Sequence, residues 1–174
     1  MIIVCLSLGA CAQRASISIP SDARFAAQGW KEVNMSGYLP DPGIRVKKSL
    51  VCISASCGGG GFIAVGDKPM SASDRQGFQA IMANRSLTDK KLLTALHLIW
   101  DGSPVLTNIG ARITGVRRGS SVLLFTMSFS KFVPNLGQVH GIANISITAD
   151  QIHMVAAAAP TIAGAQRRLS LAGR

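Results

Sequence analysis

The strongest constraint on the fold is a switch to period-two alternation in the second half of the chain. In segment 122–133, apolar residues alternate with polar ones: Leu123, Phe125, Met127 and Phe129. This alternation is typical of an antiparallel strand with one buried face. Segments 105–116 and 139–148 read the same way, and Arg117-Arg118-Gly119-Ser120 reads as a turn between the first two. The region is therefore predicted to form a three-stranded antiparallel meander.

Two helices are predicted ahead of this meander. The spacings Ser71-x-x-Asp74 and Ser86-x-x-Asp89 are typical of helix N-caps, in which a hydroxyl is followed by an acid three residues later. Apolar residues at helical spacing follow each of them.

A last helix is predicted after the meander, with Thr148-x-x-Gln151 as its cap and an alanine run at 156–159 inside it. Pro160 should break or kink this helix. Because strands and helices come in separate runs, the fold class predicted is α+β, a single domain with an antiparallel sheet and helices packed on it.

The N-terminus predicts where the protein resides. A short apolar run over residues 2–8 leads to small residues and a cysteine, the layout of a secretory signal. Leu8-Gly9-Ala10-Cys11 resembles the lipobox of bacterial lipoproteins. The resemblance implies that residues 1–10 are a signal peptide and that Cys11 begins the mature chain, with diacylglycerol on its thiol and palmitate-type acylation. Residues 11–16 would then be a tether, and residues 17–174 the single domain.

One feature departs from the lipoprotein pattern: no Lys or Arg precedes Arg14. A signal truncated at its start would explain this, whereas the alternative is that residues 2–12 form a buried strand with two core cysteines. Acyl chains contribute about 0.8 kcal/mol per buried CH₂ group and hold a protein on a membrane without a spanning helix. In that family, Ala12 after the cysteine is compatible with sorting to the outer membrane. We therefore expect a periplasm-facing anchor, at the outer rather than the inner membrane.

Cys52 and Cys57 are separated by four residues, which is not the C-x-x-C spacing of redox motifs. Strand-like segments at 46–52 and 62–65 flank them, so we predict a disulfide across a hairpin whose loop is 53–56. Two reduced thiols are the alternative. Gly58 to Gly61 is interpreted as a flexible hairpin arm, although a glycine run can also present backbone N–H groups to an anion.

The chain is strongly basic, with 18 Lys and Arg against 8 Asp and Glu and a net charge of +10. Such a surface favours anionic partners. The doublets Lys47-Lys48 and Arg117-Arg118 are the candidate anion-binding surface. Nucleic acid is not the expected partner, because aromatic residues are not interleaved with these cations as a stacking platform requires.

Catalytic and metal motifs are not recognised. The chain has neither G-x-S-x-G nor H-E-x-x-H, and the three histidines do not fall at ligand spacing. Ser128-x-x-Lys131 has the S-x-x-K spacing, but it lies in a predicted strand, where residues three apart point to opposite faces. No catalytic residue, metal or cofactor is therefore predicted.

Segment 105–148 and the ending 148–171, with Arg167-Arg168-Leu169-Ser170, resemble PsbP-like domains. That resemblance implies an assembly or binding role without a catalytic site. We therefore expect a non-catalytic cell-envelope lipoprotein that binds or scaffolds an unknown protein partner at the membrane surface. The alternative is a cationic module that binds an anionic polymer, either envelope polysaccharide or nucleic acid.

Overall fold

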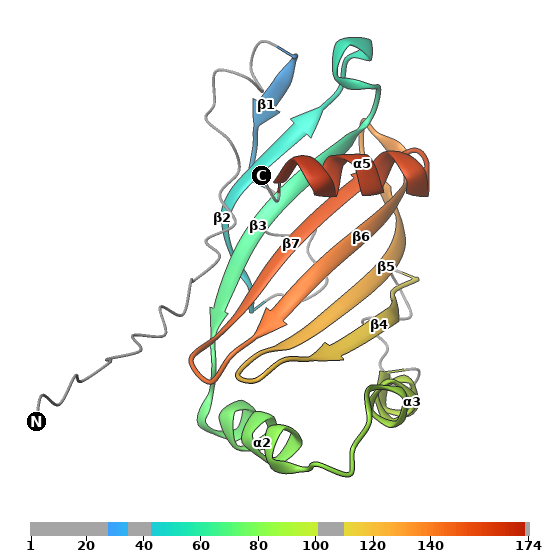
Figure 1. Ribbon diagram of the computed structural model, residues 1–174. Helices are drawn as coiled ribbons and strands as arrows, with labels where there is room; N and C mark the ends of the chain where they lie inside the picture. Colours follow the sequence, from blue (N-terminus) through green and yellow to red (C-terminus); the bar gives the residue numbers. More distant parts are fainter. Residues whose placement is uncertain (1–27, 35–42, 101–109, 173–174) are drawn as a thin grey trace, which may run out of the picture.

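The computed structural model describes residues 28–34, 43–100 and 110–172. Within these ranges the chain forms a seven-stranded antiparallel sheet with the order β1-β2-β3-β7-β6-β5-β4, together with helices (Figure 1). The α+β single-domain prediction is confirmed. The strands are β1 (Trp30–Glu32), β2 (Arg45–Cys52), β3 (Gly61–Pro69), β4 (Arg112–Arg118), β5 (Leu123–Val133), β6 (Gly137–Ile147) and β7 (Gln151–Ala159). The helices are α2 (Ala72–Ala83), α3 (Asp89–Trp100), α5 (Ile162–Ala172) and the 3₁₀ turn η2 (Ala55–Cys57).

The meander is present and its alternation holds. Strands β5 and β6 pair without a break from Leu123↔Ile147 to Val133↔Gly137. The four apolar residues that alternate along β5 are all buried: Leu123, Phe125, Met127 and Phe129. Arg117 and Arg118 belong to β4 rather than to the turn, which is closed by Gly119 and Val122.

The predicted helix starting at Thr148 is wrong. Gln151–Ala159 is a central strand, β7, and Thr148 instead closes the β6–β7 turn by pairing its N–H with the Gln151 carbonyl. Residues 154–159 are all buried, because β3 and β6 flank the strand and both of its faces are covered. A strand buried on both faces reads as a continuous apolar run, which resembles a helix core in sequence. The C-terminal helix starts only after Pro160.

Of the two N-caps predicted ahead of the meander, one is confirmed. Ser71 and Asp74 form a reciprocal capping box at the start of α2. Ser86 does not cap α3, because the Lys91 N–H is bound by the Thr88 hydroxyl at 3.3 Å. Ser86 instead bonds to the Asn84 side chain in the connection between the two helices.

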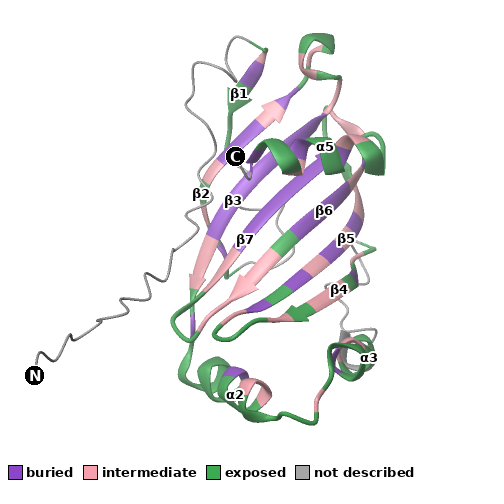
Figure 2. Ribbon diagram, viewed as in Figure 1, coloured by how far each residue is buried: buried purple, intermediate pink, exposed green. Residues whose placement is uncertain are grey.

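The two faces of the sheet carry different layers. On one face, α5 lies across β3, β6 and β7 (Figure 1). We call this the α5 face. Ala172 and Leu169 of this helix pack with Ile63, Val65 and Val155. Figure 2 shows that burial is concentrated in the central strands. Helices α2 and α3 lie at the end of the sheet away from α5, on the opposite face.

The face opposite α5 has an apolar core with a deep aromatic contact. The rings of Phe62 and Phe129 stack at 6.2 Å between centroids. Gly141 makes room for Phe129, because a Cβ at that position would lie 2.0 Å from the ring. Small residues on the central strands therefore determine where the large rings pack.

Several predictions concern residues outside the described ranges. These are the signal at 1–10, the lipidated Cys11 and the tether at 11–16, together with residues 105–109 of the first predicted meander strand. In the described part of the chain, no helix is both long and apolar enough to cross a membrane.

Candidate functional site

An apolar pocket of about 400 Å³ lies between helix α2 and the face of the sheet opposite α5. We call it the α2 pocket. Its walls come from β5, β6, β7, α2, α3 and the residues next to β2 and β3. The apolar lining consists of Ile44, Met70, Phe78, Ile81, Leu96, Leu123, Phe125, Met127, Ile145, Ile147, Ile152 and Met154, and Ser73 and Asp74 are the polar side chains at its edge. A concave, mostly apolar site of this size is typical of a small-molecule pocket.

Helix α2 covers this pocket rather than filling it. Among its residues only Phe78 is buried, while Ile81 and Met82 are partly exposed. Its N-terminus is held by the Ser71–Asp74 capping box, which lowers the pKa of Asp74 through the hydrogen bond from Ser71. The Arg118 guanidinium, on β4, donates to the carbonyls of Ile81 and Asn84 at the other end of the helix.

Gly77 lies in the middle of α2 and is one of the residues that line the pocket. It is exposed, and there is open space where a Cβ would be placed. Glycine inside a helix is less favourable than alanine by about 1 kcal/mol. The chain therefore has a weaker helix at a position that borders the pocket.

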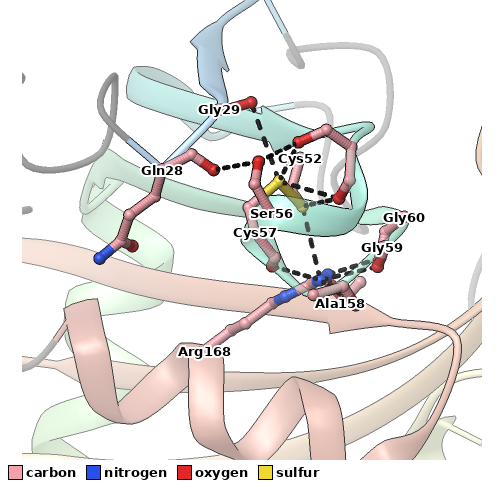
Figure 3. The surroundings of a disulfide bond; sticks show 11 residues. Gln28, Gly29, Cys52, Ser56, Cys57, Gly59, Gly60, Ala158 and Arg168 are labelled. Carbon is pink, nitrogen blue, oxygen red and sulfur yellow. Dashed lines mark hydrogen bonds between the residues drawn. A yellow bond between two sulfur atoms is a disulfide. The ribbon is translucent and has the colours of Figure 1, made fainter.

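A separate group of polar contacts surrounds the disulfide (Figure 3). Cys52 and Cys57 are bonded, which confirms the predicted pairing. The bond does not cross the hairpin, however, because Cys52 pairs with Gly61 and Cys57 lies within the connecting loop. Ser56 ties this loop to residues ahead of β1 by donating to the Gln28 carbonyl at 3.1 Å.

The glycine loop binds a cation through its carbonyls. Arg168, from α5, is only 5% exposed and donates to Gly59 O at 2.8 Å, Gly60 O at 2.6 Å and Ala158 O at 2.7 Å. Burial lowers the pKa of Arg168, with a smaller contribution from Arg167. Its guanidinium also lies 5.2 Å from the Trp30 ring, a cation–π contact. These hydrogen bonds thus hold α5 against the loop of the β2–β3 hairpin.

The contact between this loop and Arg168 explains why positions 58–61 are all glycine. Gly58, Gly59, Gly60 and Gly61 all have positive φ, and a Cβ on Gly61 would lie 1.6 Å from the Arg168 guanidinium. Only glycine allows this backbone path and so close an approach. The anion-binding alternative for the glycine run is not favoured, because carbonyl oxygens face the guanidinium.

The four predicted anion-binding cations are not brought together. Lys47 and Lys48 lie on β2, whereas Arg117 and Arg118 lie on β4 at the far edge, with four strands between β2 and β4. Five steps of roughly 4.8 Å separate β2 from β4, a distance of about 24 Å. Lys47 forms an ion pair with Asp67, and Arg118 holds the end of α2.

The contact between Asp67 and His153 was not predicted. Their side chains meet on neighbouring strands β3 and β7, although they are 86 residues apart in sequence. No local pattern marks this pair, since β7 was predicted as a helix. Strand pairing alone brings the two groups together.

The other histidines lie elsewhere. The His97 ring lies 2.8 Å from the Ile113 carbonyl, and the His140 ring lies 3.2 Å from the Ser130 hydroxyl. In residues 28–34, 43–100 and 110–172, no group of three or more His, Cys, Asp or Glu side chains could hold a metal ion.

No protein-family model matches this chain, and no curated protein matches it.

Proposed function

We propose that the protein is a non-catalytic lipoprotein of the cell envelope that binds an apolar ligand of the acyl-chain type in the α2 pocket. The observation that carries the proposal is an apolar pocket of about 400 Å³ between α2 and the sheet, with a mid-helix glycine in its lining. The polar side chains of the pocket, Ser73 and Asp74, lie at the N-terminus of α2, where the Asp74 carboxylate is occupied by the cap. The site therefore offers apolar contact rather than reactive groups.

The α2 pocket is open to solvent, so it does not carry the free-energy cost of a closed, empty cavity, and a ligand can enter it. Helix α2, with a single buried side chain, is the element that can shift to admit a ligand.

The envelope location is supported by two features. Leu8-Gly9-Ala10-Cys11 has the lipobox form, and the Cys52–Cys57 disulfide persists best in an oxidising compartment such as the periplasm. A lipid-anchored protein would meet acyl chains at the membrane surface. Binding of an anionic polymer is not proposed, because two of the four predicted cations are engaged within the fold.

The pocket is tested with Gly77→Leu, using Gly77→Ala as the matched control. Both variants should unfold at a higher denaturant concentration, because each removes the helical glycine. We expect a fluorescent long-chain fatty acid to bind the wild type and Gly77→Ala with similar affinity. Gly77→Leu should bind at least about tenfold more weakly, because its side chain occupies the pocket. If Gly77→Leu bound the fatty acid as tightly as the wild type, the α2 pocket would not be the binding site.

The anchor is tested by intact mass after expression in a host that lipidates proteins. The wild type should carry a diacylglycerol mass that Cys11→Ser lacks. An unmodified wild-type chain that remains soluble on cell fractionation would contradict the lipoprotein assignment without affecting the pocket.

A further inference from the structure

A row of directly paired residues crosses the α5 face at the end away from α5. Its successive register partners are Asp67 on β3, His153 on β7, Ser146 on β6, Leu124 on β5 and Arg117 on β4. Because directly opposed residues point to the same face, these side chains lie side by side. We call them the His153 row.

The first two members of the row fix the orientation of the imidazole. Asp67 Oδ1 is bound to His153 Nδ1, and Asp67 Oδ2 pairs with Lys47. Partial burial raises the pKa of Asp67, but the hydrogen bonds and charges of Lys47 and His153 outweigh it and lower the pKa overall. The ionised carboxylate can only accept, so Nδ1 carries the hydrogen.

The other ring nitrogen of His153 is left without a partner. Nε2 is buried and makes no hydrogen bond in the structure. A buried polar atom without a hydrogen-bond partner is destabilising and calls for an explanation. In this protein the atom belongs to a residue that lines an open hollow.

That hollow has a volume of about 390 Å³ and lies over β4, β5, β6 and β7. Its polar lining includes Arg117, Thr126, Asn144, Ser146 and His153. The Thr126 hydroxyl donates to Asn144 Oδ1 at 3.4 Å, which leaves the Asn144 amide nitrogen as a donor. Arg117 and Asn144 are exposed, and Ser146 is half-buried.

The charges around the row are mainly positive. Arg45, Lys47 and Arg117 are cationic, and Asp67 is the anionic group in contact with His153. We propose that this hollow is a binding site for a phosphate or carboxylate group, held by Arg117, Asn144 and Ser146. The Arg117 fork matches the geometry of both anions.

The site is independent of the α2 pocket, which lies on the opposite face, and is tested with sulfate because the charge of sulfate does not change near neutral pH. Backbone amide NMR shifts of the purified protein would be followed during sulfate titration. We expect saturable shifts at residues 144, 146 and 153. Arg117→Gln and Ser146→Ala should each weaken binding, by about tenfold and about threefold.

Arg112→Gln is the matched control, because Arg112 is an exposed arginine on the same strand that does not line the hollow. Its sulfate affinity should equal that of the wild type. Equal losses in Arg112→Gln and Arg117→Gln, or shifts spread over all basic residues, would overturn the proposal in favour of general charge screening. An absence of saturation would overturn it as well.

Acetate and vesicles identify the source of the anion. Saturable acetate binding that depends on Arg117 indicates a carboxylate ligand. Binding to phosphatidylglycerol vesicles but not to phosphatidylcholine vesicles, again dependent on Arg117, indicates a lipid headgroup. Either result supports the site, whereas binding to both kinds of vesicle irrespective of Arg117 contradicts it.

Discussion

Replacement of Arg168 by methionine tests whether the guanidinium fastens α5 to the β2–β3 hairpin. The variant keeps a long side chain but removes the three hydrogen bonds that the guanidinium donates to the carbonyls of Gly59, Gly60 and Ala158. Hydrogen bonds from a charged group contribute about 1.5–3 kcal/mol each, so three of them sum to at least about 4.5 kcal/mol. The variant also avoids the cost of burying a cation. We therefore expect a net loss of about 3 kcal/mol.

Urea unfolding followed by circular dichroism measures this loss as a lower midpoint with an unchanged m-value. For a chain of this size, a loss of about 3 kcal/mol lowers Tm by roughly 6–12 °C. Arg167→Gln is the control, because Arg167 is the exposed neighbour on the same helix, and its effect should stay within about 0.5 kcal/mol. If Arg168→Met were as stable as Arg167→Gln, the hydrogen bonds from Arg168 to the loop carbonyls would contribute nothing to the free energy of unfolding, and the reasoning would fail.

Two further predictions concern the same fold. Reduction of the Cys52–Cys57 bond should lower the unfolding free energy by about 2 kcal/mol, because closing a loop with a sequence separation of 5 removes about this much entropy from the unfolded chain. Urea titration with and without reductant measures the change. An unchanged unfolding free energy on reduction would contradict the prediction. Folding lowers the pKa of Asp67, so its stabilising contribution is complete above its unfolded pKa of about 3.9 and is lost as pH falls through the folded value. Asp67→Asn should therefore be less stable than the wild type at pH 7, and this difference should shrink below about pH 4; a constant difference from pH 7 to pH 2 would refute it.

Short-range patterns in the sequence correctly predicted several elements. The alternation from Leu123 to Phe129, the Ser71 capping box and the Cys52–Cys57 bond each depend on residues close together in the chain. Backbone period, capping and short-loop closure are local effects, so composition and spacing determine them.

The remaining features depend on non-local pairing. The segment containing Ala156 became a strand because β3 and β6 offered hydrogen bonds on both sides, which outweighed its helical pattern. Arg168 reads as an end-of-helix cation in sequence, yet the glycine loop more than 100 residues away draws it into the interior. The α2 pocket likewise depends on distant segments, because its walls combine α2 with residues of β5, β6 and β7.

From sequence alone, then, this chain determined an antiparallel meander, a capped helix, a loop disulfide and a strongly basic composition. Tertiary structure alone decided that β7 is a central strand, that Asp67 meets His153, and which cations remain exposed. The physical reason is that hydrogen bonds and burial between distant segments are settled only when the whole sheet forms, and their combined free energy exceeds any local preference.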